Sequence, residues 1–67
     1  MKIFSERLKE LREKEGLSQK AMANILGIVQ PSYFRYEQGG ELSLETLVKI
    51  AKYFEVSSDY LLGLSDF

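Results

Sequence analysis

The side chains of this 67-residue chain exclude most catalytic and metal chemistry. The chain has no His and no Cys, which removes the imidazole-activated nucleophiles of the common hydrolases and proteases. The same absence removes disulfides and the usual zinc sites. The carboxylates of Glu41 and Glu45 would need a substrate pocket that so small a domain does not offer. We therefore expect no enzyme, no metal ion, no cofactor and no small-molecule ligand.

Hydrogen bonding is the chemistry that remains, and the side chains suited to it gather in the middle of the chain. Gln19, Gln30, Ser32 and Arg35 all fall between residues 18 and 38. Glutamine and arginine can each form two hydrogen bonds to one planar partner. Such residues act together only when the surrounding elements hold them on one surface.

Helices are the elements that the sequence predicts around these residues. Apolar residues recur at helical spacing over about residues 5–15, 18–26, 30–38, 43–54 and 59–62. Candidate N-caps are Ser5, Ser18, Ser43 and either Ser57 or Ser58, and glycines such as Gly16, Gly27 and Gly39 end the helices. In the fourth helix the apolar stripe is Leu44, Leu47, Val48, Ala51 and Phe54. No strand-like alternation occurs, so we expect one compact all-α domain over residues 1–67.

The spacing is most specific between about residues 18 and 38. A helix from Ser18 to Gly27, a turn over residues 27–29 and a third helix follow the helix-turn-helix layout of DNA-binding proteins. Ala23 is small enough for the helix crossing, and Gly27 suits a turn with positive φ. The core face would hold Met22, Leu26, Ile28, Tyr33 and Tyr36, and the opposite face would hold Gln30, Pro31, Ser32, Phe34 and Arg35. The alternative is an ordinary five-helix globule, which also shows glycine turns and apolar stripes.

Several short motifs together resemble the lambda-repressor-like family, also called the Cro/repressor or xenobiotic-response-element type. They are Leu8-Lys9-Glu10-Leu11-Arg12, Gly16-Leu17-Ser18-Gln19, Gly27, Arg35-Tyr36-Glu37-Gln38-Gly39, Ser43-Leu44-Glu45-Thr46-Leu47 and Tyr60-Leu61-Leu62-Gly63. They stand in the family's order over about residues 5–63. The resemblance implies a five-helix domain whose third helix enters the DNA major groove. It also implies a dimeric transcriptional regulator, commonly a repressor.

The resemblance also implies which side chains touch DNA. Gln19 matches the glutamine that contacts the DNA backbone, beside the free N–H groups of a helix N-terminus. Residues at the start of the third helix match the family's base-reading positions, and Arg35 lies one turn further on. Arg12 and Glu37 match an ion pair that holds this helix in place. The predicted DNA-binding residues are Gln19, Lys20, Gln30, Pro31, Ser32, Phe34 and Arg35.

Three residues depart from the family pattern. Val29 stands where a capping Ser or Thr is usual, and Pro31 limits readout at its position to apolar contact, for instance with a thymine methyl group. Phe34 falls on the face expected to meet DNA. It has three readings: contact with a thymine methyl or the sugar backbone, a protein-facing surface, or burial against the neighbouring loop.

The charge is low for a protein that binds nucleic acid. Nine basic and ten acidic residues give a net charge of −1, so we expect few phosphate contacts and a shallow dependence of affinity on salt. Binding would then rely on a homodimer at an inverted-repeat operator in double-stranded DNA. The apolar residues Leu61, Leu62, Leu64 and Phe67 would bury against the domain or a second subunit.

A second hypothesis uses the same fold differently. Phe34, Val29, Pro31 and the net charge of −1 also suit a protein-interaction module of the antitoxin or antirepressor-binding type. No apolar run is long enough to span a membrane, and the charged N-terminus is unlike a signal peptide. A cytoplasmic protein is therefore expected, either complete as a small regulator or the head of a larger one.

Overall fold

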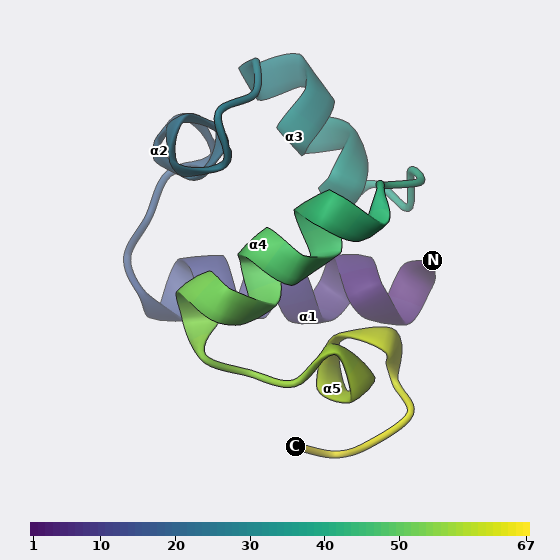
Figure 1. Cartoon of the computed structure of the whole chain (residues 1–67). Helices are drawn as coiled ribbons and strands as arrows, with labels where there is room; N and C mark the ends of the chain where they lie inside the picture. The colour runs from purple at the N-terminus through teal and green to yellow at the C-terminus, as the bar shows by residue number, and fades with distance from the viewer.

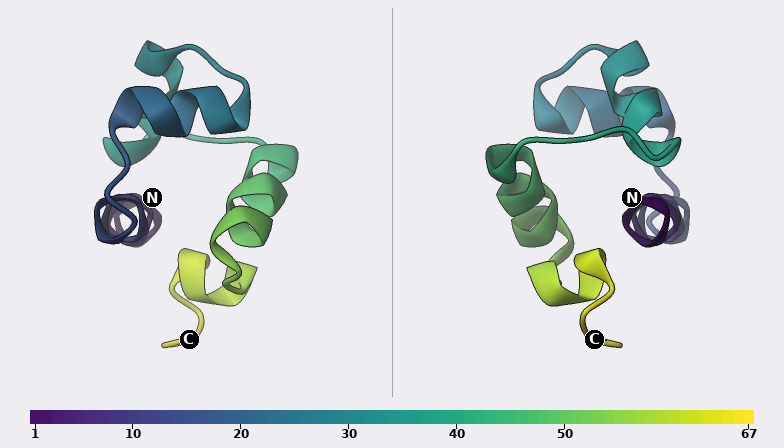
Figure 2. Two further views of the ribbon diagram at one scale, coloured as in Figure 1. Left: turned by 90° about the vertical axis from the view of Figure 1, so that its left-hand side faces the viewer. Right: turned by 90° about the vertical axis from the view of Figure 1, so that its right-hand side faces the viewer.

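The computed structural model describes residues 1–67 and contains five α-helices and no strand. The helices are α1 (Lys2–Lys14), α2 (Gln19–Leu26), α3 (Gln30–Glu37), α4 (Leu44–Phe54) and α5 (Ser58–Leu62) (Figure 1). α2 and α3 form one end of the molecule and α5 lies at the other. α1 and α4 lie between them on opposite flanks (Figure 2). The predicted five-helix, all-α fold is confirmed.

Three helices begin at serine N-caps, as predicted. The hydroxyls of Ser18, Ser43 and Ser57 accept hydrogen bonds from the backbone N–H groups of residues 21, 46 and 60, at 3.0, 3.1 and 3.0 Å. Each serine satisfies one of the N–H groups that a helix start leaves unpaired. The cap of α5 is thus Ser57 rather than Ser58. α3 has no side-chain cap and begins after Val29 with Pro31 in its first turn, where a missing N–H costs little.

The prediction that Ser5 caps the first helix is wrong. α1 begins at Lys2, and Ser5 lies within it as a buried residue. Its hydroxyl donates to the carbonyl of Tyr36 at 2.5 Å and accepts from the N–H of Gly39 at 2.9 Å. Ser5 therefore joins α1 to the end of α3 instead of starting a helix.

The turn of the helix-turn-helix unit begins at Gly27, which ends α2 in the left-handed backbone conformation. This residue has φ 71°, and the N–H of Ile28 bonds back to the carbonyl of Ala23 at 3.0 Å. A residue with a Cβ is strained in this conformation, which explains the glycine. α2 and α3 then pack directly on each other, with Ala23 almost fully buried.

The core contains nine buried apolar residues drawn from all five helices. They are Phe4, Leu8, Met22, Ala23, Leu26, Tyr33, Leu47, Ile50 and Leu61. In α4 the predicted stripe is partly wrong, because Leu44 and Val48 are 80% and 49% exposed while Ile50 is buried. At the C-terminus Leu61 is buried, but Leu64 and Phe67 are exposed.

None of the helices combines the length and the apolar character needed to cross a lipid bilayer.

Candidate nucleic-acid interface

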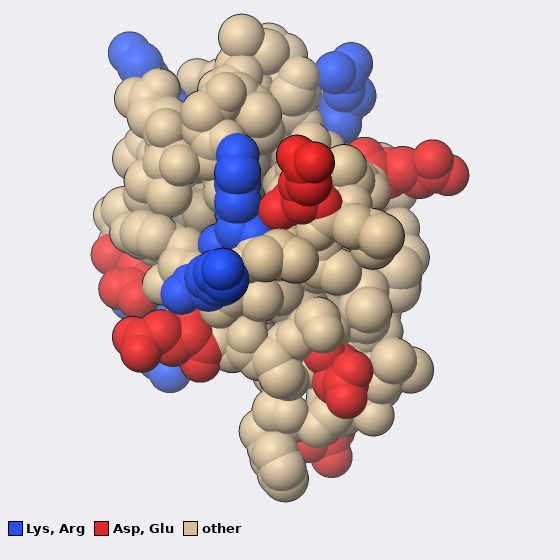
Figure 3. Space-filling model, in the orientation of Figure 1, with Lys and Arg blue, Asp and Glu red and all other residues tan.

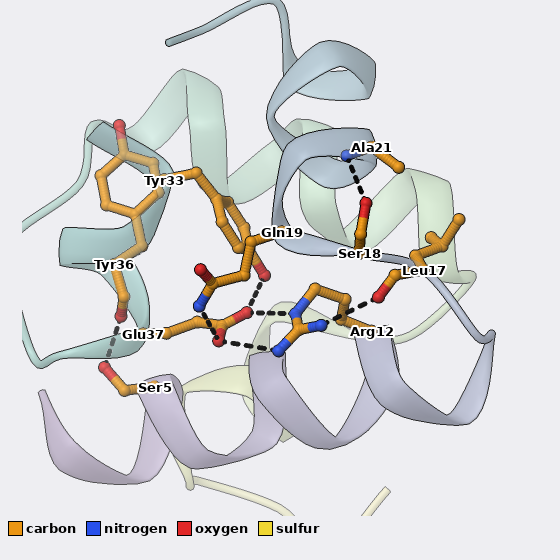
Figure 4. A network of polar contacts seen from close by, with 9 residues as sticks. All are labelled: Ser5, Arg12, Leu17, Ser18, Gln19, Ala21, Tyr33, Tyr36 and Glu37. Carbon is orange, nitrogen blue, oxygen red and sulfur yellow. Dashed lines mark hydrogen bonds and ion pairs between the residues drawn. The ribbon is translucent and has the colours of Figure 1, made fainter. Parts of the chain in front are cut away.

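A buried carboxylate fixes α3 against α1 and α2. Glu37 Oε2 accepts from Arg12 Nε at 2.6 Å, and its Oε1 accepts from Arg12 Nη2 at 3.1 Å. The Tyr33 hydroxyl also donates to Oε2, and Gln19 Nε2 donates to Oε1 at 3.2 Å (Figure 4). Arg12 Nη1 extends the network to the carbonyl of Leu17 at 2.8 Å. The predicted Arg12–Glu37 pair is present. The hydrogen bonds from Gln19 to Glu37 and from Arg12 to Leu17 also hold the start of α2 next to the end of α3.

Arg12 and Glu37 of this network are both ionised near neutral pH. Burial by itself would raise the pKa of Glu37, but hydrogen bonds from Arg12, Tyr33 and Gln19 outweigh it and hold this pKa below its usual value. The hydrogen bond to Glu37 raises the pKa of Arg12. Burial, followed by the bond to Glu37, raises the pKa of the Tyr33 phenol. Glu37 is therefore an ionised group that only accepts hydrogen bonds.

The ionised carboxylate sets the orientation of the Gln19 amide. A carboxylate cannot donate, so the nitrogen of the amide faces Glu37 and its oxygen faces away (Figure 4). One of the two amide hydrogens is used inside the protein. Gln19 was predicted as a backbone-contact residue, and the structure adds an internal bond that holds it in place.

Five of the seven predicted DNA-binding residues line one open groove. The groove measures about 510 Å³ and is bordered by Gln19, Gln30, Pro31, Phe34 and Arg35. Phe34 is 46% exposed, so it is not buried against the neighbouring loop. The floor thus combines the apolar surfaces of Pro31 and Phe34 with two amides and a guanidinium.

The two remaining residues lie outside this groove lining. Lys20 is exposed near the N-terminus of α2. Ser32 is half-buried, and its hydroxyl accepts from Arg35 Nη2 at 3.2 Å. Arg35 makes no ion pair, because the only one in the structure joins Arg12 to Glu37. Its guanidinium is held lightly by Ser32 and remains available on the surface.

The outer surface of α2 and α3 carries positive charge despite the net charge of −1. Lys20 and Arg35 are exposed, whereas Glu37, the one acidic residue of these two helices, is buried and paired. In Figure 3 the upper end of the molecule shows basic atoms and no acidic ones. Acidic atoms lie lower, at the left where α1 ends, near the start of α4 and near α5.

Two features of this site were not predicted from the sequence. The sequence pattern predicts Tyr33 as a core residue but does not predict the hydrogen bond from its hydroxyl to Glu37. The spacing from 33 to 37 is the i,i+4 spacing that makes such contacts on a helix, and it was the available signal. Gly40 was also missed as a packing residue: a Cβ there would stand 2.8 Å from the carbonyl oxygen of Arg35.

Comparison with known proteins agrees with this architecture. Residues 8–61 match the family model described as Helix-turn-helix. The chain is 46% identical over 61 residues to the SPbeta prophage-derived uncharacterized HTH-type transcriptional regulator YonR of Bacillus subtilis, covering 90% of this chain and 56% of YonR. It is 36% identical over 55 residues to the cryptic phage CTXphi transcriptional repressor RstR of Vibrio cholerae, covering 81% of this chain and 50% of RstR. The chain thus spans about half the length of these curated relatives.

A solved structure shares the fold closely. The P22 c2 repressor, in complex with a synthetic operator, matches with a TM-score of 0.81 and 26% identity, over 91% of this chain and 94% of that chain. The match covers all but a few residues of both. The chain therefore belongs to the helix-turn-helix family of the lambda-repressor-like type, a family of DNA-binding transcriptional regulators rather than enzymes.

Proposed function

We propose that this chain is the sequence-specific DNA-binding part of a transcriptional regulator, acting as a repressor by occupying an operator. The groove bordered by Gln19, Gln30, Pro31, Phe34 and Arg35 carries the proposal. It lies on the outer surface of the helix-turn-helix unit, where no carboxylate is exposed. The family and the operator-bound structural relative support the same partner, double-stranded DNA.

Base recognition falls to the first turns of α3, inserted in the major groove. Gln30 can bond N6 and N7 of adenine, and Arg35 can bond O6 and N7 of guanine. Pro31 and Phe34 offer apolar surface to the methyl groups of thymines beside these bases. Ser32 supports Arg35 through its hydroxyl and makes only secondary contact with DNA.

Phosphate contacts fall to the N-terminus of α2. There the backbone N–H groups of residues 19 and 20 point out of the helix, because Ser18 caps only the N–H of residue 21. Lys20 adds a positive charge, and Gln19 adds its second amide hydrogen, since the first is donated to Glu37. These groups fix the register of the protein on DNA without reading sequence.

A homodimer on an inverted repeat completes the proposal. Two copies related by a two-fold axis would present their α3 helices to half-sites about 34 Å apart. The relative RstR is named a transcriptional repressor, which supports repression as the outcome. A repressor acting in this way would work in the cytoplasm.

Selection from a random double-stranded DNA pool tests this function. The wild-type chain should enrich an inverted repeat with adenine and guanine at fixed positions in each half. The double variant Gln30→Ala, Arg35→Ala should lose that enrichment, while Lys9→Ala, at an exposed position on α1, should retain it. A pool that stays random with the wild-type chain, even at low salt, would refute sequence-specific binding.

A second candidate is a protein-interaction module, and the exposure of Phe34 is the observation that favours it. A large aromatic ring that is 46% exposed can anchor a protein partner as well as cover a thymine methyl. The same selection separates the two functions. Phe34→Ala should alter the enriched bases beside the adenine if Phe34 meets DNA, and an unchanged sequence would favour the protein partner.

A further inference from the structure

The outward side of α4 is apolar and has no partner within the chain. Leu44 and Val48 stand one helical turn apart and are 80% and 49% exposed. Together with Glu45 and Lys49 they border an open hollow of about 400 Å³. An apolar stripe between polar residues on a small domain is typical of an interaction surface.

The charges along α4 are segregated by sign. Glu41 precedes the helix and Glu45 lies in its first turn, Lys49 and Lys52 stand in its C-terminal half, and Glu55 follows as the C-cap, one turn beyond the lysines. On the front of the molecule, where α4 runs, acidic atoms lie on the right and basic atoms to their left, with further acidic atoms beyond them at the lower left (Figure 3). None of these residues has an ion-pair partner in the chain, because the single ion pair joins Arg12 to Glu37.

This pattern is complementary to itself in one orientation only. When two such helices lie antiparallel, the acidic end of each faces the basic half of the other. When they lie parallel, like charges meet. The two apolar residues occupy the middle of the contact in the antiparallel arrangement, which is the arrangement of an isologous two-fold interface.

We propose that α4 packs antiparallel on α4 of a second copy of this chain. Leu44 and Val48 would form the apolar centre, and Glu45 would face Lys49 and Lys52 of the second copy. This inference rests on the proposed function, since it names the surface of that dimer. α4 occupies a flank while α2 and α3 form the end of the molecule (Figure 2), so a copy seated there leaves the outer surface of α3 uncovered.

The exposed C-terminal residues are a weaker surface for the same partner. Leu64 and Phe67 are 75% and 91% exposed, but the charged residues nearest to them in the sequence are Asp59 and Asp66. Arg7 is the basic side chain beside them, and it is already bonded to the carbonyls of Tyr60 and Ser65. Two copies meeting there would bring carboxylates together without the alternating lysines that α4 offers. Leu64→Ser is therefore a matched control for changes on α4.

Charge reversal tests the proposed interface without DNA. Sedimentation should show the wild type as a dimer at high protein concentration, and both Glu45→Lys and the double variant Lys49→Glu, Lys52→Glu as monomers. An equal mixture of the two reversed variants should dimerise, because opposite charges then face each other again. A monomeric wild type into the millimolar range, a Glu45→Lys that dimerises normally, or a mixture that stays monomeric would each overturn the interface.

A second variant separates this inference from the proposed function. Leu44→Ser should weaken self-association roughly a hundredfold, because the two-fold axis repeats each lost apolar contact. Its affinity for a single half-site should equal that of the wild type, and Leu64→Ser should match the wild type in both assays. If the wild type dimerises but binds no operator, the proposed DNA function is wrong and the proposed interface is not affected. Half-site binding by a wild type that stays monomeric would overturn this interface alone.

Discussion

Among single residues, Glu37 connects the largest number of elements. Its carboxylate accepts from Arg12 of α1, Gln19 of α2 and Tyr33 of its own helix. No buried side-chain nitrogen or oxygen lacks a partner, and both oxygens of this carboxylate accept hydrogen bonds. Removing a donor leaves part of a buried charge unsolvated, which costs more than an average hydrogen bond.

Tyr33→Phe removes one donor and keeps the shape of the core. We expect the free energy of unfolding to fall by about 2 kcal/mol, because the lost bond is made to a charged acceptor. Urea denaturation followed by circular dichroism measures it. Tyr53→Phe, at an exposed ring whose hydroxyl makes no bond within the chain, should change stability by no more than about 0.5 kcal/mol. Equal effects of the two substitutions would contradict the role assigned to the Tyr33 hydroxyl.

Glu37 also makes stability depend on pH in the acidic range. Its pKa in the folded chain is lower than the usual 4.5, so the folded state holds the proton less tightly than the unfolded state does. The stabilisation is therefore complete above about pH 4.5 and is lost as the pH falls through the lower folded pKa. Urea midpoints taken at successive pH values should show this loss.

The matched variants for this pH effect are Glu37→Gln and Glu41→Gln. Glu37→Gln should be less stable at neutral pH and should lose less stability on acidification, because the buried titrating group is gone. Glu41→Gln, at an exposed position, should follow the wild-type profile. An unchanged acid profile in Glu37→Gln would assign the pH dependence to other carboxylates.

At the scale of helices, local chemistry explains most of what the sequence predicted. Ser18, Ser43 and Ser57 cap their helices because a hydroxyl two or three residues before a helix N–H needs no distant partner. The prediction of an N-cap at Ser5 failed because the Ser5 hydroxyl forms its hydrogen bonds with the backbone of residues 36 and 39, which are far away in the sequence. Contacts of that kind leave no local pattern.

In the candidate site, features that depend on helical spacing could be predicted from the sequence, and features that depend on how the helices pack could not. Gln30 and Phe34, and likewise Pro31 and Arg35, are neighbours because of the i,i+4 spacing of a helix alone. The internal bond of Gln19 depends on how α2 meets α3, which the sequence does not state. The stripe on α4 was placed wrongly for a related reason: α2 and α5 pack against this helix and cover Leu47 and Ile50, leaving Leu44 and Val48 outside.

One helix end provides a stability test. The C-cap of α4 is Glu55, which is the only non-glycine residue with positive φ, at 56°. The N–H of Val56 bonds to the carbonyl of Ala51 at 3.0 Å, the same closing bond that follows Gly27. Glu55→Gly should raise the free energy of unfolding by about 0.5–1 kcal/mol, because it removes the left-handed strain. Glu13→Gly, inside α1, should lower it by about 1 kcal/mol. Destabilisation by both, measured in urea, would contradict this account of Glu55.

At the scale of the whole molecule, charge is distributed along one direction. The end formed by α2 and α3 exposes Lys20 and Arg35 and no carboxylate, while α5 and the C-terminal residues carry Asp59 and Asp66. Such a distribution would orient the protein in the field of DNA even though its net charge is −1. It would add little free energy to DNA binding, however, because Lys20 and Arg35 are the exposed cations of α2 and α3.

The salt dependence of operator binding should therefore be shallow. Each neutralised phosphate contributes about −0.9 to the slope of log K against log salt concentration. With Lys20 and Arg35 as the exposed cations of α2 and α3, we expect a slope of about −2 per bound subunit. Lys20→Gln should make it shallower by about one per subunit, and Lys9→Gln, at an exposed position on α1, should leave it unchanged. Fluorescence anisotropy with a selected operator at several salt concentrations measures this. A wild-type slope steeper than about −4 per subunit would show that phosphates reach basic residues beyond α2 and α3, and the DNA would then have to extend toward α1 or α4.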